Sequence, residues 1–170
     1  MSRRVGLFLA CAAGVLGLDQ ATKALAAGRL VLGDPVPVVG EFVRLTLVHN
    51  RGAAFGLFPG SRVPFIIVSV LAIAVVLFLF ARDAYRSGLS RVLLGSILGG
   101  ALGNLIDRAR LGYVVDFVEV GVGNLRWPVF NVADSAVTLG VLILAWNLAR
   151  PGRHAAAPAE NPPGSTVASG

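Results

Sequence analysis

The apolar residues of this chain fall into long runs separated by polar segments, and these runs predict four membrane-spanning helices. The predicted spans are 5–27, 63–81, 92–110 and 129–149. An α-helix rises 1.5 Å per residue, so about 20 residues cross a hydrocarbon core of about 30 Å. The second span carries no charge, and the fourth is interrupted only by Asp134. The pattern therefore predicts a four-helix membrane protein.

The first span is long enough only if it includes polar residues. Its unbroken apolar part, Val5 to Leu18, has 14 residues, and full length requires Asp19, Gln20 and Lys23 as well. A signal peptide with a cleavage site near Cys11 is the alternative. That alternative leaves about five apolar residues before Cys11, fewer than the usual 7–15. We therefore interpret the segment as a membrane span with a polar end.

The segments between the spans contain β-type patterns. Residues 36–39 and 42–48 are β-branched and partly alternating, and so is the stretch 113–118. Such runs predict strands, here in a small sheet at the membrane surface. The predicted fold class is an all-α membrane protein with four transmembrane helices and a small extramembrane β-sheet. Residues 1–150 are predicted to form one membrane-embedded domain, and the Pro/Ala/Gly-rich segment 151–170 is predicted to be a disordered tail.

Composition and charge support a membrane protein. Apolar residues make up 55% of the chain and charged residues 14%, whereas an ordinary soluble domain is roughly one quarter charged. The single cysteine excludes an internal disulfide framework. The net charge of +6 comes from arginines that flank the apolar runs, so it indicates topology and headgroup contacts rather than a nucleic-acid partner.

The arginines also predict the orientation. Seven of them lie in the termini and in the loop 82–91, in short segments close to span ends, while the other eight basic residues are spread over longer segments. Positive charge near span ends marks the cytoplasmic side. We therefore expect both termini in the cytoplasm and the small sheet on the periplasmic, outer side of the membrane.

Four carboxylates lie at or inside span ends, where a buried charge is costly and is often functional. Asp19 precedes Lys23 by four residues, so the two share a helix face and can neutralise each other. Asp107 can be neutralised by Arg108 or by other neighbours. These pairings leave a purely structural role open for Asp19, Lys23 and Asp107.

The other two carboxylates, Asp116 and Asp134, have no adjacent base. Asp134 lies one turn into the fourth span, after Asn131, which is well placed to cap that helix. A capping role is therefore the alternative for Asp134. Two carboxylates brought together cannot both ionise, so one can act as base on a water molecule while the other, protonated, polarises a scissile carbonyl.

Other hydrolytic chemistries have no support in the sequence. The two histidines, His49 and His154, are far apart, and neither an HExxH nor a CxxC motif is present. A metal mechanism therefore has no visible ligands. No serine or cysteine arrangement competes with the carboxylate pair, and no cofactor is indicated. On the third span, Gly95, Gly99 and Gly103 recur every four residues and predict close helix packing.

Five short blocks, in order, carry a resemblance to a known family. They are DQATK (19–23), NRGAAF (50–55), GGALGNLIDR (99–108), VVDF (114–117) and FNVADS (130–135). With these blocks the sequence resembles the lipoprotein signal peptidases, also called signal peptidase II. The blocks cover residues 19–135, about two thirds of the chain.

The resemblance implies an aspartic endopeptidase of the bacterial inner membrane whose active site lies near the outer leaflet. Such an enzyme removes the signal peptide from a diacylglyceryl-modified prolipoprotein by cleaving before the lipidated cysteine. It implies Asp116 and Asp134 as the catalytic pair. Asn50, Asn104 and Arg108 match positions that contact substrate or globomycin-type inhibitors. Supporting positions are matched by Asp19, Lys23, Gly52, Asp107, Asn131 and Ala133.

The alternative function is a proton-coupled small membrane carrier, which would also use intramembrane carboxylates. Four spans without an internal repeat are poorly suited to alternating access. An intramembrane protease of the presenilin type would need a Gly-x-Gly-Asp motif, which the chain lacks. Globomycin distinguishes a lipoprotein signal peptidase from a carrier, since we expect the peptidase to bind it and the carrier not to.

Overall fold

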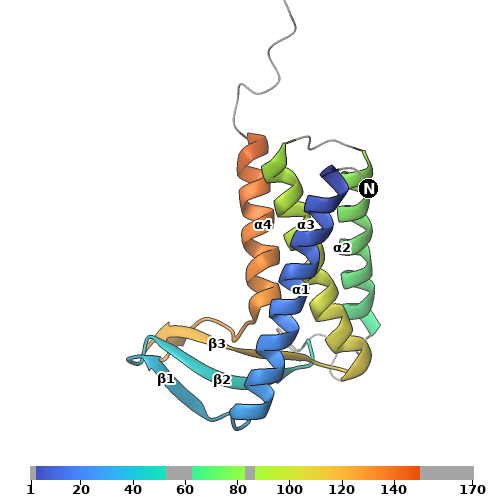
Figure 1. The fold of residues 1–170 in the computed structure, drawn as a ribbon. Helices are drawn as coiled ribbons and strands as arrows, with labels where there is room; N and C mark the ends of the chain where they lie inside the picture. The colour runs from blue at the N-terminus through green and yellow to red at the C-terminus, as the bar shows by residue number, and fades with distance from the viewer. Residues whose placement is uncertain (1–2, 53–62, 83–86, 150–170) are drawn as a thin grey trace, which may run out of the picture.

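The computed structural model describes residues 3–52, 63–82 and 87–149. Four helices stand side by side as a bundle, and a small sheet projects sideways from one end of it (Figure 1). The helices are α1 (Arg3–Arg29), α2 (Val63–Ala81), α3 (Gly88–Arg110) and α4 (Val132–Ala149). The predicted tail 151–170 lies outside the described residues.

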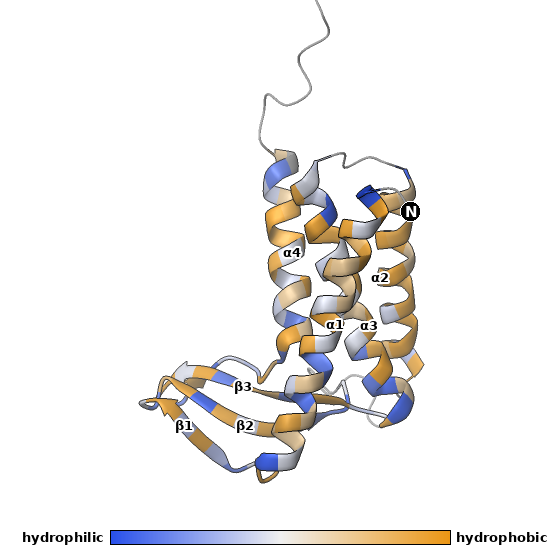
Figure 2. Cartoon of the chain, in the orientation of Figure 1, coloured by the Kyte–Doolittle hydropathy of each residue, from blue (hydrophilic) through white to orange (hydrophobic). Residues whose placement is uncertain are grey.

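The bundle has the surface of a membrane protein. Three helices, α1, α2 and α3, are long and apolar enough to cross a membrane, and α4 contains a shorter apolar stretch, Val132–Asn147. Large apolar side chains are exposed on its outside, among them Val68 and Leu71 of α2. The hydrophobic colour predominates on α2 and α4, while hydrophilic positions lie at both ends of the bundle, including the end where the helices meet the sheet (Figure 2). The predicted four-helix membrane fold is confirmed.

The sheet has four antiparallel strands in the order β1-β2-β3-β4. They are β1 (Pro35–Val39), β2 (Val43–Asn50), β3 (Val114–Val122) and β4 (Leu125–Arg126). The first three confirm the strands predicted from β-branched alternation. The two-residue β4 was not predicted, because it is too short to show a pattern. Gly123, with φ of +54°, turns the chain between β3 and β4.

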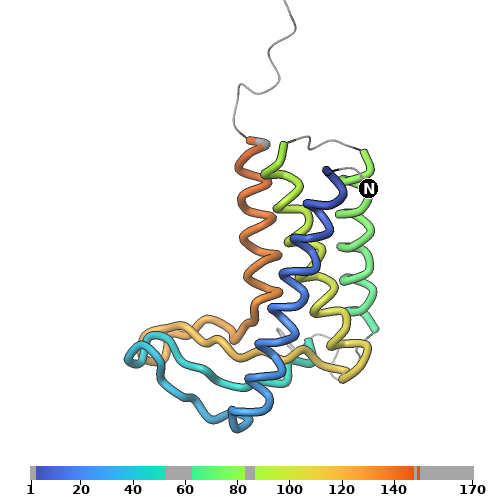
Figure 3. Tube along the Cα trace, viewed as in Figure 1, coloured from blue at the N-terminus to red at the C-terminus, as the bar shows by residue number. Residues whose placement is uncertain are grey.

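Helix α3 is the centre of the bundle (Figure 3). Small residues let its neighbours approach. A Cβ atom on Gly95 or Gly99 would collide with the backbone oxygens of Phe8 and Ala12 on α1. A Cβ on Gly100 would collide with the backbone oxygen of Ala133 on α4. The predicted close packing through glycine is thus confirmed, and it brings the backbones of α1, α3 and α4 together.

A hydrophobic cluster fixes the sheet against the end of α1. Ala26 of α1 packs with Leu47 of β2 and with Val115 and Phe117 of β3. Successive side chains of a strand point to opposite faces, so Val115 and Phe117 on the α1 side turn the intervening Asp116 to the other face. The hydrophobic contact of β3 with α1 therefore determines where the Asp116 carboxylate points.

We expect Gly99→Ala to destabilise the protein by about 1–3 kcal/mol, because the added methyl group forces α1 away from α3. Gly17→Ala is the matched control: nothing lies within 4 Å of its added Cβ, so its stability should stay within about 0.5 kcal/mol or rise. Unfolding of both variants in detergent measures the difference. Equal stabilities would contradict the packing argument.

Candidate active site

Asp116 lies on β3 with its carboxylate almost completely buried, at 1% exposure. One oxygen, Oδ1, accepts a hydrogen bond of 2.7 Å from Nδ2 of Asn131, and the other, Oδ2, accepts one of 2.8 Å from Nδ2 of Asn50. Asn50 is the last residue of β2 and pairs with Val114, two residues before Asp116 on the neighbouring strand. The register of the sheet therefore delivers Asn50 to the carboxylate.

Asp134 lies in the first turn of α4, where it forms a reciprocal cap with Asn131. The Asp134 backbone N–H donates to Asn131 Oδ1 at 2.9 Å, and the Asn131 backbone N–H donates to Asp134 Oδ2 at 3.2 Å. Such paired contacts satisfy donors at a helix start. The predicted cap by Asn131 is confirmed. The cap engages only one carboxylate oxygen, because Asp134 Oδ1 accepts a 2.8 Å bond from Nδ2 of Asn104.

Asn131 links the two carboxylates, since its side chain donates to Asp116 while its backbone donates to Asp134. Burial is the main reason that the pKa of Asp116 rises to about 6. The hydrogen bond from Asn50 lowers this pKa, and the negative charge of Asp134 raises it again. Asp116 is therefore a carboxyl group that can hold a proton near neutral pH.

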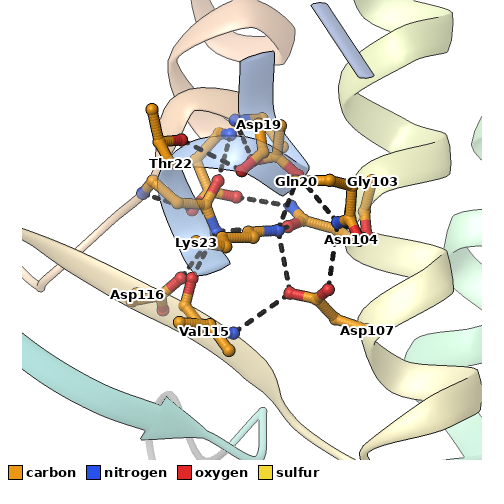
Figure 4. A network of polar contacts seen from close by, with 12 residues as sticks. Asp19, Gln20, Thr22, Lys23, Gly103, Asn104, Asp107, Val115 and Asp116 are labelled. Carbon is orange, nitrogen blue, oxygen red and sulfur yellow. Dashed lines mark hydrogen bonds and ion pairs between the residues drawn. The ribbon is translucent and has the colours of Figure 1, made fainter. Parts of the chain in front are cut away.

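Behind the pair lies a buried ion cluster around Lys23 of α1 (Figure 4). Its Nζ atom is 2.9 Å from Asp19 Oδ2, 2.9 Å from Asp107 Oδ2 and 2.9 Å from Asn104 Oδ1. The side chains of Lys23, Asp19 and Asp107 are at most 5% exposed. The predicted Asp19–Lys23 pair forms, and Asp107 pairs with Lys23 on the other helix.

The cluster also holds backbone from two further elements. Asp19 Oδ1 accepts the N–H of Ala133 on α4 at 3.0 Å, and Asp107 Oδ2 accepts the N–H of Val115 on β3 at 3.2 Å. Gln20 donates to both carboxylates, at 3.2 Å and 3.1 Å. Asp19 and Asp107 thus fix the residues next to the two catalytic candidates. The role of Gln20 was not predicted, although it lies within the first sequence block.

Arg108 and Gly52 lie at the edge of the same site. Arg108 donates from Nη1 to Ser69 Oγ and to the Asn104 backbone oxygen, both at 3.3 Å, and its guanidinium lies 5.9 Å from the Phe65 ring centre. Gly52 has φ of +81°, and an added Cβ would collide with the Phe65 ring. Its N–H donates to Asn50 Oδ1 at 2.8 Å, which orients the Asn50 amide.

The structure therefore brings all the predicted site residues together. One hydrogen-bonded network contains Asp116, Asp134, Asn50, Asn104 and Asn131. The ion cluster contacts this network at Asn104 and also holds the backbone of Ala133, next to Asp134. Gly52 contacts it at Asn50, and Arg108 contacts it at Asn104. Ser69 is a further member that the sequence did not indicate. Within residues 3–52, 63–82 and 87–149, no group of three or more His, Cys, Asp or Glu side chains is arranged to hold a metal ion.

An open groove leads to Asp134. It has a volume of about 380 Å³ and a mainly apolar lining from the sheet and α4. The lining residues are Val120, Trp127, Phe130, Asp134, Ser135, Thr138 and Leu139. Trp127 and Leu139 are exposed at the outside of the molecule, whereas Asp116 is buried. Asp134 is thus the member of the pair that lines a surface groove.

Comparison with known proteins places this arrangement in a family. The family model described as signal peptidase (SPase) II matches residues 11–150. The chain belongs to the signal peptidase II family. The lipoprotein signal peptidase of Desulforapulum autotrophicum is 44% identical over 139 residues, covering 79% of this chain and 86% of that protein. That of Geobacter sulfurreducens is 43% identical over 153 residues, covering 88% and 96%.

A solved structure described as a bacterial membrane enzyme, determined by the in meso method at 1.9 Å resolution, superposes with a TM-score of 0.79 and 32% identity. The match covers 87% of this chain and 96% of that one. As a member of the signal peptidase II family, the chain is a membrane aspartic peptidase, as the sequence predicted. The alternative of a proton-coupled carrier is not favoured.

We expect Asn50→Ala to raise the pKa of Asp116 above about 6, because the variant loses a hydrogen bond that stabilises the ionised carboxylate. Asn147→Ala is the control, since Asn147 donates to the Ile143 backbone oxygen near the opposite end of α4 and should leave the pKa unchanged. Titration of ¹³C-labelled aspartate by NMR measures the shift. An unchanged or lower pKa in Asn50→Ala would contradict the geometry.

Proposed function

We propose that this chain removes signal peptides from diacylglyceryl-modified prolipoproteins, cleaving before the lipidated cysteine with Asp116 and Asp134 as the catalytic pair. The observation that carries the proposal is the linkage of the two carboxylates by Asn131 at the junction of β3 and α4. The name shared by the similar proteins supports the substrate class. The rest of the proposal follows from what surrounds the two carboxylates.

All four oxygens of the pair accept hydrogen bonds from N–H groups. Asn131 and Asn50 donate to Asp116, while Asn104 and the Asn131 backbone donate to Asp134. An amide N–H group donates a hydrogen bond and cannot accept one. A proton on either carboxyl group must therefore point toward the other carboxylate, a water molecule or a substrate carbonyl. The surrounding network therefore leaves a proton on the pair available for transfer to water or to the substrate.

The reaction follows from one proton shared by the pair. The ionised carboxylate takes a proton from water as the water oxygen attacks the scissile carbonyl carbon. The protonated carboxyl group donates to the carbonyl oxygen and stabilises the negative charge that develops there. The C–N bond then breaks, and the leaving amine takes a proton from the pair. The two groups titrate as one coupled unit, so the roles of Asp116 and Asp134 are assigned to the pair.

The site suits a substrate that is held in the membrane. A lipid-anchored prolipoprotein reaches the enzyme laterally, and the apolar groove beside α4 has Asp134 in its lining. We place the protein in the bacterial inner membrane with both termini in the cytoplasm and the sheet at the outer leaflet. Arg108 can offer a planar donor fork to a substrate carbonyl, and Asn50 and Asn104 donate to the two carboxylates at which the substrate would lie. Globomycin-type inhibitors would bind there.

Replacing either catalytic aspartate should abolish cleavage. We expect Asp116→Asn and Asp134→Asn each to lower kcat by at least about 10³-fold, because neither variant can share a proton between two carboxyl groups. Asp34→Asn is the matched control: Asp34 is an exposed carboxylate beside the sheet, and its variant should cleave at the wild-type rate. Cleavage of a diacylglyceryl-modified prolipoprotein by purified protein in detergent measures kcat.

All proteins in this assay must unfold at similar temperatures. A folded Asp116→Asn or Asp134→Asn variant that retains near-wild-type activity would show that the replaced aspartate is structural. An inert wild-type protein, tested on a prolipoprotein that another signal peptidase II cleaves, would refute the proposed substrate.

A further inference from the structure

The Lys23 ammonium uses all three of its N–H groups inside the bundle. Two are matched by Asp19 and Asp107, and the third by the side-chain oxygen of Asn104, each at 2.9 Å. Two carboxylates already exceed the single positive charge, so charge balance does not require the third contact. The bond to Asn104 connects residues 81 positions apart on α1 and α3, and it points from the ion cluster toward the catalytic pair.

This third contact fixes the direction of an amide. A carboxamide has an oxygen on one side and an NH₂ group on the other, and the two orientations have nearly the same shape. An ammonium group has donors only, so it must meet the Asn104 oxygen. The NH₂ group is then turned away from Lys23, and it donates to Asp134 Oδ1 at 2.8 Å.

We propose that Lys23 is a positioning residue for the catalytic pair: its ammonium holds the Asn104 amide in the one orientation that donates to the Asp134 carboxylate. The inference rests on the proposed function, because it assigns a further role within the same site. In the described part of the chain, the hydrogen-bonded route from Lys23 to Asp134 runs through Asn104.

The other two amides of the site are oriented by nearby backbone. Asn50 Oδ1 accepts the N–H of Gly52, and Asn131 Oδ1 accepts the N–H of Asp134. Asn104 lies inside α3, where the backbone N–H groups are used by the helix itself, so its oxygen needs a donor from elsewhere. Nδ2 of Asn131 has two N–H groups and donates to that oxygen at 3.2 Å as well as to Asp116 at 2.7 Å, so the charged ammonium of Lys23, at 2.9 Å, is the stronger of the two donors to the Asn104 oxygen.

Loss of the ammonium would leave the Asn104 oxygen with the 3.2 Å donor from Asn131 and would let the amide reverse. In the reversed orientation, the NH₂ group of Asn104 would lie on the side where Lys23 had been. The Asn104 oxygen would then face the Asp134 carboxylate, where a donor is replaced by an acceptor. Buried ion clusters are a weak source of stability, and setting the orientation of a neighbour is a role that a hydrophobic replacement cannot supply.

The experiment removes Lys23 without changing the charge of the cluster. Lys23→Met combined with Asp107→Asn leaves Asp19 as the only charge, so the group keeps its net charge of −1. The wild-type protein is the reference, because its cluster has the same net charge, and Asp107→Asn alone reports the separate effect of that change, since its amide oxygen can still accept the Val115 N–H. Against the wild type we expect kcat on the prolipoprotein to fall on the order of 10²-fold, with KM changed by less than about threefold.

A double-mutant cycle separates positioning from a merely structural role. In an Asn104→Ala background, the same Lys23→Met change should lower kcat by less than about threefold, because the amide through which Lys23 acts is gone. A loss of equal size in both backgrounds overturns the inference. If the Met variant does not fold, Lys23→Gln with Asp107→Asn replaces it: its amide can still donate to Asp19 but no longer forces the Asn104 orientation, so a smaller loss with the same dependence on Asn104 is expected.

The outcome for the wild-type protein keeps the two proposals distinct. If the wild-type protein cleaves the prolipoprotein and Lys23→Met lowers kcat equally in the two backgrounds, only the proposed role of Lys23 is refuted. Absence of wild-type cleavage on a competent prolipoprotein refutes the proposed function, and the role of Lys23 with it.

Discussion

A positive charge buried among three helices and a sheet must be surrounded by acceptors, and this requirement organises the polar end of the bundle. Lys23 gathers Asp19, Asp107 and Asn104, and the two carboxylates in turn accept the backbone N–H groups of Ala133 and Val115. An unpaired charge in such a place would cost several kcal/mol. The start of α4 and the start of β3 are therefore held to α1 and α3 by the same ion cluster, and the two catalytic candidates follow one residue later on each element.

Close backbone approach is what makes this cluster compact. A Cβ on Gly103 would collide with the Asp19 carboxylate, and one on Gly100 would collide with the Ala133 backbone, whose N–H that carboxylate accepts. The glycines of α3 are thus part of the site as well as of the packing. A larger residue at either position would move α1 or α4 outward and lengthen hydrogen bonds that are now 2.9–3.0 Å.

Much of the fold could be predicted because its elements have strong local signals. Long apolar runs specify helices, and β-branched alternation marked β1, β2 and β3. Asn131, near the start of the fourth predicted span, indicated a cap. The geometry of the site could not be obtained that way, because Asn50, Asn104 and Asp116 meet only through sheet register and helix packing. The partner of Asp107 shows the difference: its sequence neighbour is Arg108, but Arg108 contacts Ser69 while Lys23, 84 positions away, takes the carboxylate.

The site is asymmetric in a way that follows from its construction. Asp116 lies buried on strand β3, and this burial raises its pKa. Asp134 lies in the first turn of α4 and lines the groove. A helix start stabilises negative charge through its unpaired N–H groups, and the cap with Asn131 adds to that effect. Two identical side chains thus meet different environments, one buried on a strand of the sheet and one at the start of a helix beside a surface groove. The asymmetry comes from the fold, since the sheet supplies Asp116 and the helical bundle supplies Asp134.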